Sequence, residues 1–73
     1  MSKFPERLRE LRQARKLSQL DLANTLGYSC SSISNYETGK HEAGYDTLIT
    51  LALFFDVSVD YLLGNSDNHN KNE

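Results

Sequence analysis

The chain has 73 residues, 38% of them hydrophobic, and a net charge of -2, which is enough for one small domain and excludes a larger architecture. Its single Cys excludes an internal disulfide, and its two His, His41 and His69, have no partners at metal-ligand spacing, so we predict neither a metal site nor a cofactor. No stretch approaches the ~18 apolar residues of a membrane helix, and the N-terminus lacks a long apolar run, so we expect a cytoplasmic protein.

Charge is distributed unevenly along the chain. Residues 1–40 contain seven Lys and Arg against four Asp and Glu, whereas residues 41–73 contain one against six. Such asymmetry fits a protein with one side facing a polyanion and the other side turned away from it. The negative total favours a modest number of phosphate contacts over a basic surface that wraps nucleic acid.

The first helix is predicted from Pro5 to Arg15, because Pro suits the first turn of a helix. Phe4, Leu8 and Leu11 recur at helical spacing, and Ala14 extends the same apolar stripe. This stripe predicts the face of the helix that packs on the core.

The next stretch predicts two short helices, Gln19–Leu26 and Cys30–Glu37, joined by a tight turn. A Ser precedes each helix, where its hydroxyl can accept a bond from an unpaired backbone N–H group, and a Gly follows each helix, where a left-handed residue commonly ends it. Helix, sharp turn and helix form the arrangement with which many proteins read DNA. The residues that carry the pattern are Ser18, Asp21, Gly27, Ser29 and Gly39.

A fourth helix is predicted from Gly44 or Tyr45 to Phe55, and a short fifth helix runs from its N-cap Ser58 to Leu63. The polar residues 65–73 show no periodicity and predict a disordered tail. We therefore expect an all-α, five-helix bundle over residues 1–64.

An ordered set of positions carries a family resemblance: Leu8, Leu11-Arg12, Leu17-Ser18-Gln19, Leu22-Ala23, Gly27, Ile33-Ser34, Tyr36-Glu37, Gly39, Leu48, Leu51-Ala52 and Val57 to Gly64. With these residues the chain resembles the Cro/CI-type (Xre-like) helix-turn-helix family of phage repressors and bacterial transcriptional regulators. It departs from the family pattern at Ala43, where Pro is usual, and at Gly44, where Ser often caps the next helix. The resemblance implies a lambda-repressor-like bundle, encoded by a bacterium or phage, that binds DNA as a two-fold dimer with its third helix in the major groove.

The exposed face of the third helix holds the candidate base-reading residues. Cys30 and Ser31 lie in its first turn, Asn35 lies one turn further on the same face, and Ser34 is a weaker candidate. The Asn side chain offers a donor beside an acceptor, which matches adenine N6 and N7. The alternative is that Asn35 is an ordinary solvated residue.

Phosphate contacts are expected around the same two helices, because helix N-termini attract anions. In the family, the Gln at the start of the second helix bonds a phosphate and braces the third helix. Tyr45 is expected to be half-buried with its hydroxyl near a phosphate. The candidates are Gln19, Ser29, Lys40 and Tyr45, with the backbone N–H groups near Gly39 and Gly44.

The family resemblance also implies an ion pair between Arg12 and Glu37, which would hold the third helix at a fixed tilt. An apolar excess around the last two helices predicts a dimer patch. Its candidate members are Leu53, Phe54, Val57, Tyr61 and Leu62.

These features predict a sequence-specific regulator of transcription that binds double-stranded DNA as a homodimer, and no enzyme site is recognisable. We expect the protein to repress transcription. The alternative is a protein-interaction module, such as an antitoxin, that uses the surface of the last two helices. The acidic second half of the chain keeps that alternative open.

Overall fold

The structure, a computed structural model, describes residues 3–67 of the chain. Over that range it contains five α-helices and no β-strand, so the predicted all-α, five-helix architecture is confirmed. Each helix lies within one residue of its predicted bounds. The helices are α1 (Phe4–Ala14), α2 (Gln19–Leu26), α3 (Cys30–Thr38), α4 (Tyr45–Phe55) and α5 (Val59–Leu63).

Local side-chain caps explain where most helices begin. Ser18 and Asp21 form a reciprocal capping box, in which the Asp21 N–H donates to Ser18 Oγ at 2.9 Å and the Ser18 N–H donates to Asp21 Oδ2 at 3.1 Å. Ser29 and Ser58 each accept a bond from the backbone N–H three residues on. Gly27 then ends α2 with a φ of +78°, a left-handed conformation that Gly adopts without strain.

The apolar stripe of α1 is shorter than its sequence pattern predicts. Phe4 and Leu8 are buried and Leu11 is half-buried, but Ala14 is exposed, so its assignment to the core face is wrong. The chain leaves the helix at this point and reverses through Lys16, which has a φ of +59°. Ala14 therefore lies on the last turn of α1, beyond the part of the helix that packs on the core.

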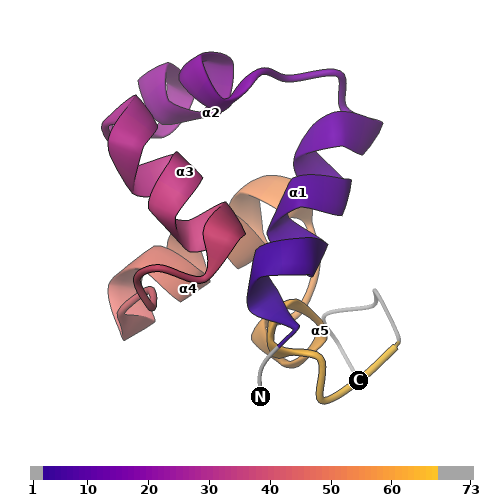
Figure 1. The fold of residues 1–73 in the computed structure, drawn as a ribbon. Coiled ribbons are helices and arrows are strands. Elements are labelled where there is room, and N and C mark those ends of the chain that lie inside the picture. Colours follow the sequence, from indigo (N-terminus) through magenta and orange to yellow (C-terminus); the bar gives the residue numbers. More distant parts are fainter. Residues whose placement is uncertain (1–2, 68–73) are drawn as a thin grey trace.

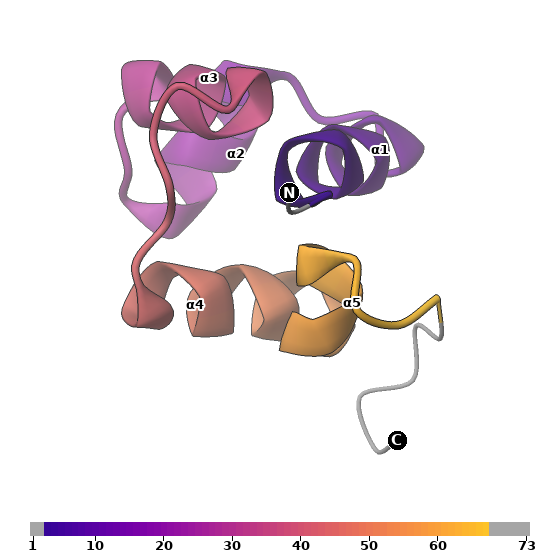
Figure 2. The same cartoon turned by 60° about the horizontal axis from the view of Figure 1, so that its bottom comes forward.

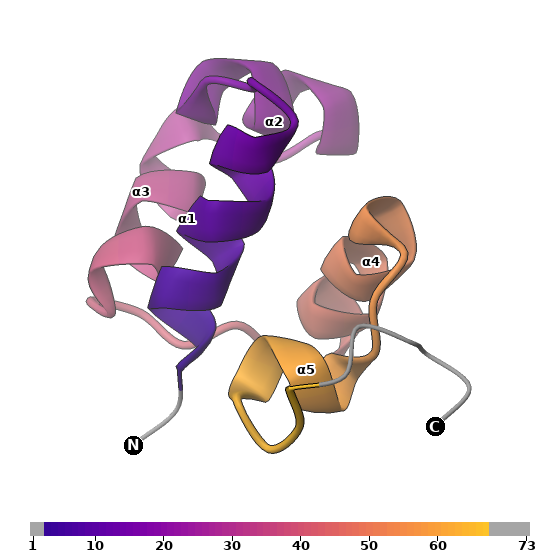
Figure 3. The ribbon, with the colours of Figure 1, turned by 90° about the vertical axis from the view of Figure 1, so that its right-hand side faces the viewer.

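The five helices form two layers, which Figure 2 shows with α1, α2 and α3 above α4 and α5. Figure 1 gives their order along the chain. Helix α3 packs against both α1 and α2, while α5 packs against α1 and α4. Figure 3, seen from the side, shows α1 and α3 running next to each other with α4 set apart from them. This arrangement leaves one side of α3 on the surface.

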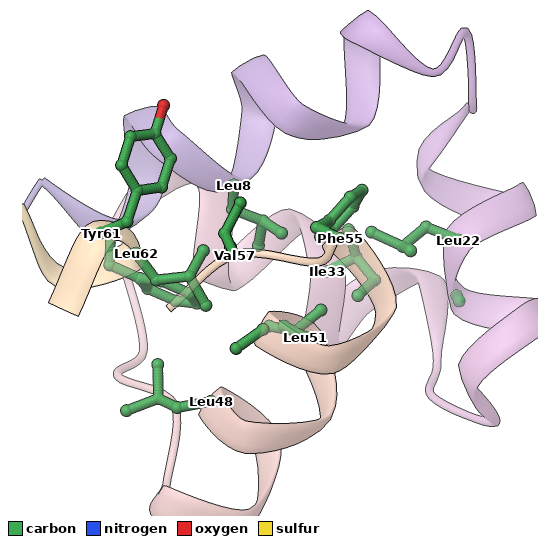
Figure 4. Packing of buried hydrophobic residues seen from close by; sticks show 12 residues of the cluster. Leu8, Leu22, Ile33, Leu48, Leu51, Phe55, Val57, Tyr61 and Leu62 are labelled. Atoms are coloured by element: carbon green, nitrogen blue, oxygen red, sulfur yellow. The ribbon is translucent and has the colours of Figure 1, made fainter. Parts of the chain in front are cut away.

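Each helix contributes one large, fully buried apolar side chain to the core between the layers (Figure 4). Burying such a side chain contributes about 1.5–3 kcal/mol relative to leaving it exposed. The core thus depends on all five helices together, as expected for a domain close to the lower size limit. The five residues are Leu8, Leu22, Ile33, Leu51 and Leu62.

Arg7 ties α1 to the chain that follows α5. Its Nη1 donates to the carbonyl oxygens of Tyr61 at 2.9 Å and Ser66 at 3.0 Å, and its Nη2 lies 2.7 Å from Asp67 Oδ1. The same guanidinium stacks 4.0 Å from the centroid of the Tyr61 ring. These contacts reach the first residues of the predicted tail, of which residues 68–73 lie outside the described range.

None of the helices in residues 3–67 combines the length and the apolar character needed to cross a membrane.

Candidate nucleic-acid interface

Helix α3 has one buried side and one exposed side. Ile33 (0% exposed) and Glu37 (2% exposed) point into the protein, whereas Cys30 and Ser31 are exposed in the first turn. Ser34 and Asn35 are half-buried. None of the four candidate base-reading residues is therefore among the buried residues of the core.

Asn35 is tied into the fold through its backbone, not its side chain. Its carbonyl oxygen accepts from the N–H of Lys40 at 2.9 Å and from the N–H of His41 at 3.3 Å, which closes the turn after α3. Within residues 3–67 its side-chain amide makes no hydrogen bond. The amide is thus available to a ligand on the outer side of the helix.

Glu37 is the centre of a buried charge cluster beneath α3. Arg12 Nε and Nη2 donate to the two carboxylate oxygens of Glu37, the second at 2.9 Å, and form the ion pair expected from the family resemblance. Gln19 Nε2 donates to Glu37 Oε1 at 3.2 Å. Arg9 Nη2 donates to the Glu37 carbonyl oxygen at 2.8 Å. One carboxylate therefore joins α1, α2 and α3, which limits how α3 can tilt.

The hydrogen bond with Glu37, supported by its negative charge, raises the pKa of the Arg12 guanidinium against the opposing effect of burial. Arg12 therefore keeps its charge throughout the working pH range. Its Nη1 also donates to the carbonyl oxygen of Leu17 at 2.8 Å, which fixes the link between α1 and α2. The pair is bidentate, a geometry that Arg provides and Lys does not.

The candidate phosphate-binding residues differ in their exposure and in whether their side chains already make a hydrogen bond. Lys40 is exposed, and Tyr45 is 87% exposed, so the expectation that Tyr45 is half-buried is wrong. Gln19 is half-buried and braces Glu37, as described above. Ser29 already caps α3, since its Oγ accepts from the Ser32 N–H at 3.1 Å.

The predicted dimer patch is wrong for three of its five members. Val57 (3% exposed), Tyr61 (8%) and Leu62 (0%) belong to the core of the single chain. Phe54 is half-buried under Arg15, whose guanidinium lies 5.1 Å from its ring centroid. Of the predicted members, only Leu53 presents a large exposed apolar surface, being 64% exposed.

Two arginines of α1, Arg7 and Arg9, have roles that the sequence does not predict. Each bonds to residues at least 28 positions away, and no local pattern joins positions so distant in the chain.

Within the described range there is no group of three or more His, Cys, Asp or Glu side chains that could hold a metal ion. The arrangement offers polar side chains on the outer side of α3 and an exposed cation, Lys40, shortly after it, a combination suited to contacts with a polyanion.

Comparisons with known proteins agree with this arrangement. Residues 6–67 match the family model described as a helix-turn-helix domain. The uncharacterized HTH-type transcriptional regulator YobD of Bacillus subtilis (strain 168) is 44% identical over 64 residues, which cover 88% of this chain and 57% of that protein. The transcriptional regulator ImmR of the same organism is 38% identical over 68 residues, covering 93% of this chain and 54% of that protein.

The cryptic phage CTXphi transcriptional repressor RstR of Vibrio cholerae is 31% identical over 64 residues, covering 88% of this chain and 58% of that protein. The chain spans a little over half the length of these relatives. With five helices in the expected order, the buried Arg12–Glu37 pair, and a family match over most of its length, the chain belongs to the Xre-like helix-turn-helix family.

Proposed function

We propose that this chain is a sequence-specific regulator of transcription that binds double-stranded DNA and acts in the cytoplasm as a repressor. It would bind an inverted-repeat operator as a homodimer, with α3 in the major groove. The names of its relatives, all regulators of transcription and one a phage repressor, support this proposal.

The observation that carries the proposal is the contrast between the two sides of α3. Its inner side is held by Ile33 and by the Glu37 cluster, while its outer side presents Cys30, Ser31 and the amide of Asn35, which has no hydrogen-bond partner among residues 3–67. A helix that is rigid on one side and polar on the other suits the major groove, whose width admits an α-helix. Asn35 would pair with adenine, and Ser31 would discriminate less, because its hydroxyl can both donate and accept.

Phosphate contacts would set the position of α3. Gln19 would hold a phosphate while it braces Glu37, and Lys40 would supply a charge at the other end of α3. Ser29, Tyr45 and the backbone N–H groups near Gly39 and Gly44 would add contacts. Few cations lie among these groups, so affinity from one copy is low, and two copies on one operator would be needed.

Selection of binding sites from a random DNA pool tests the proposal directly. We expect enrichment of an inverted repeat whose half-sites are separated by about one helical turn, roughly 10 base pairs between centres, because a two-fold dimer presents its two recognition helices at that spacing. A pool that stays random, while the protein remains folded, would contradict the proposal.

A second candidate function is a protein-interaction module, and the observation that favours it is the exposed apolar surface of α4. Ile49 (50% exposed) and Leu53 (64% exposed) lie there, and Glu42 adds negative charge near the expected DNA side. A gel shift on random DNA at low salt discriminates between the two functions. A shift favours the DNA-binding function, and its absence favours the protein-interaction function.

A further inference from the structure

An apolar stripe runs along the outer side of α4. Tyr45 (87% exposed), Ile49 (50%) and Leu53 (64%) are spaced four residues apart, so they follow one another along the helix surface. They are three of the four large exposed apolar side chains in the described range, the other being Leu20 on α2. Figure 2 shows α4 at the edge of the molecule, with no helix of the described chain on the side away from α1 and α3.

We propose that this stripe pairs with the same stripe of a second copy of the chain, with the two α4 helices antiparallel and Ile49 on the two-fold axis. The three side chains are symmetric about Ile49 along the helix. A two-fold rotation through Ile49 therefore places Tyr45 of one copy on Leu53 of the other. Such an interface is self-complementary, as closed two-fold dimers require.

Charges beside the stripe favour this antiparallel register. Successive helix residues are turned by about 100°, so Asp46, next to Tyr45, and Phe54, next to Leu53, lie on the same flank of the stripe at opposite ends. Phe54 is covered by Arg15, whose Nη1 donates to the Phe54 carbonyl oxygen at 2.9 Å. The two-fold rotation therefore brings Asp46 of each copy towards Arg15 of the other. In a parallel pairing the two copies would present opposite flanks to each other, so Asp46 of one copy would not approach Arg15 of the other.

The size of the stripe predicts a weak dimer. Helix α4 has 11 residues and is about 16 Å long, so one face offers much less than the roughly 800 Å² per partner of a standard interface. DNA that holds two copies side by side would complete the association. The biological role of the pairing rests on the proposed function, but self-association itself can be measured without DNA.

Sedimentation of the 73-residue chain over rising concentration tests the proposal. We expect a monomer–dimer equilibrium with a dissociation constant below about 1 mM, as a weak interface gives. Ile49→Glu should weaken the dimer at least tenfold, because two like charges would meet on the axis. Gln13→Glu, which adds the same charge at an exposed site on α1, should behave as the wild type. A wild-type monomer up to about 1 mM, or equal association of Ile49→Glu and wild type, would overturn the proposal.

A crosslink tests the register. In a Cys30→Ser background, Ile49→Cys should form a covalent dimer under mild oxidation at least tenfold faster than Gln13→Cys, because helices packed 8–10 Å apart bring facing Cα atoms within disulfide reach. Asp46→Arg should weaken association, and adding Arg15→Glu should restore it at least in part. Equal crosslinking rates, or no recovery in the double variant, would exclude the antiparallel register.

The α4 pairing and the proposed function can each be contradicted without the other. A dimer that is sensitive to Ile49→Glu but binds no DNA supports the pairing and contradicts the proposed function. Selection of an inverted repeat by the wild type and by Ile49→Glu with equal affinity contradicts the pairing and leaves the proposed function in place.

Discussion

Glu37 has an unusual position for a residue so close to an expected DNA surface. It is 2% exposed, and its carboxylate lies between Arg12 and Gln19, with Arg9 Nε at 3.8 Å. Its charge is therefore neutralised inside the protein before any polyanion approaches. The pairing both fixes α3 and removes a repulsion that would oppose binding.

Arg12→Ala should lower the free energy of unfolding by about 3 kcal/mol, the low end of the effect of breaking a buried ion pair, because Arg9 and Gln19 still compensate part of the Glu37 charge. Thermal or denaturant unfolding measures this change. Gln13→Ala, at the adjacent exposed position, should change stability by no more than about 0.5 kcal/mol. Superimposable melting curves for Arg12→Ala and wild type would show that the ion pair does not support the fold.

Among these single residues, the Arg12–Glu37 pair could be predicted only from the family resemblance. The partners of Arg7 and Arg9 could not be predicted, because both side chains bond mainly to backbone carbonyl oxygens of distant residues. Every residue has a backbone carbonyl, so the residue types in the sequence do not identify these contacts. They depend on how the helices pack.

At the scale of the helices, the sequence predicts most starts and ends because the caps are local. Ser18, Ser29 and Ser58 begin the helices that follow them, and the capping box at Ser18 is complete. Helix α4 differs, since its N-cap Gly44 provides no side-chain bond. This difference corresponds to the departure from the family pattern at the same position.

Gly44→Ser should stabilise the protein by about 0.5–1 kcal/mol, because a Ser hydroxyl can accept a bond from the first turn of α4 and the unfolded chain becomes less flexible. Gly44 has a φ of -73°, and a Cβ added there would meet no atom within 4 Å, so the substitution causes no strain. Chemical denaturation measures the gain. Gly44→Ala, which lacks the hydroxyl, is the matched control and should gain less; an equal gain would exclude a capping effect.

The capping box of α2 predicts a pH dependence of stability. Bonds from the backbone N–H and side chain of Ser18 lower the pKa of Asp21. A carboxylate whose folded pKa is depressed contributes stability above its unfolded pKa of about 3.9, and loses that contribution as the pH falls through the lower folded value. Wild type should therefore lose more stability than Asp21→Asn between about pH 5 and pH 2. Parallel losses would show that Asp21 does not cap the helix in solution.

Periodicity indicated which residues of α4 and α5 are apolar, but not which of them the chain itself covers. Val57, Tyr61 and Leu62 were assigned to a dimer patch and are core residues, because α1 packs on α5 from the other layer. Ile49 and Leu53 have the same hydrophobic character and are exposed. The layer arrangement, which no local pattern contains, decides between the two outcomes.

At the scale of the whole molecule, the chain has a basic first half and an acidic second half. The basic half supplies α1, α2 and α3, and the acidic half supplies α4 and α5 in the other layer (Figure 2). We therefore expect DNA to bind on the α2–α3 side and phosphate contacts to dominate affinity.

Lys40→Ala should reduce affinity for operator and random DNA by similar factors and lower the slope of log K against log salt by about one for each copy bound. Filter binding or fluorescence anisotropy at several salt concentrations gives both values. Lys16→Ala, which removes an exposed charge from the link between α1 and α2, is the comparison variant. An unchanged slope for Lys40→Ala would mean that Lys40 makes no phosphate contact.

The binding of Asn35→Ala to the selected operator and to random DNA shows whether the outer side of α3 reads base edges. The Asn35 amide makes no hydrogen bond within the described residues, so the variant should fold as the wild type. Loss of one bidentate base contact costs about 1–3 kcal/mol, so operator affinity should fall about 5- to 150-fold per half-site while random-DNA affinity is unchanged. Asn24→Ala, an exposed Asn on α2, should leave both affinities unchanged. Equal losses on both DNAs, or no loss on either, would show that Asn35 reads no base.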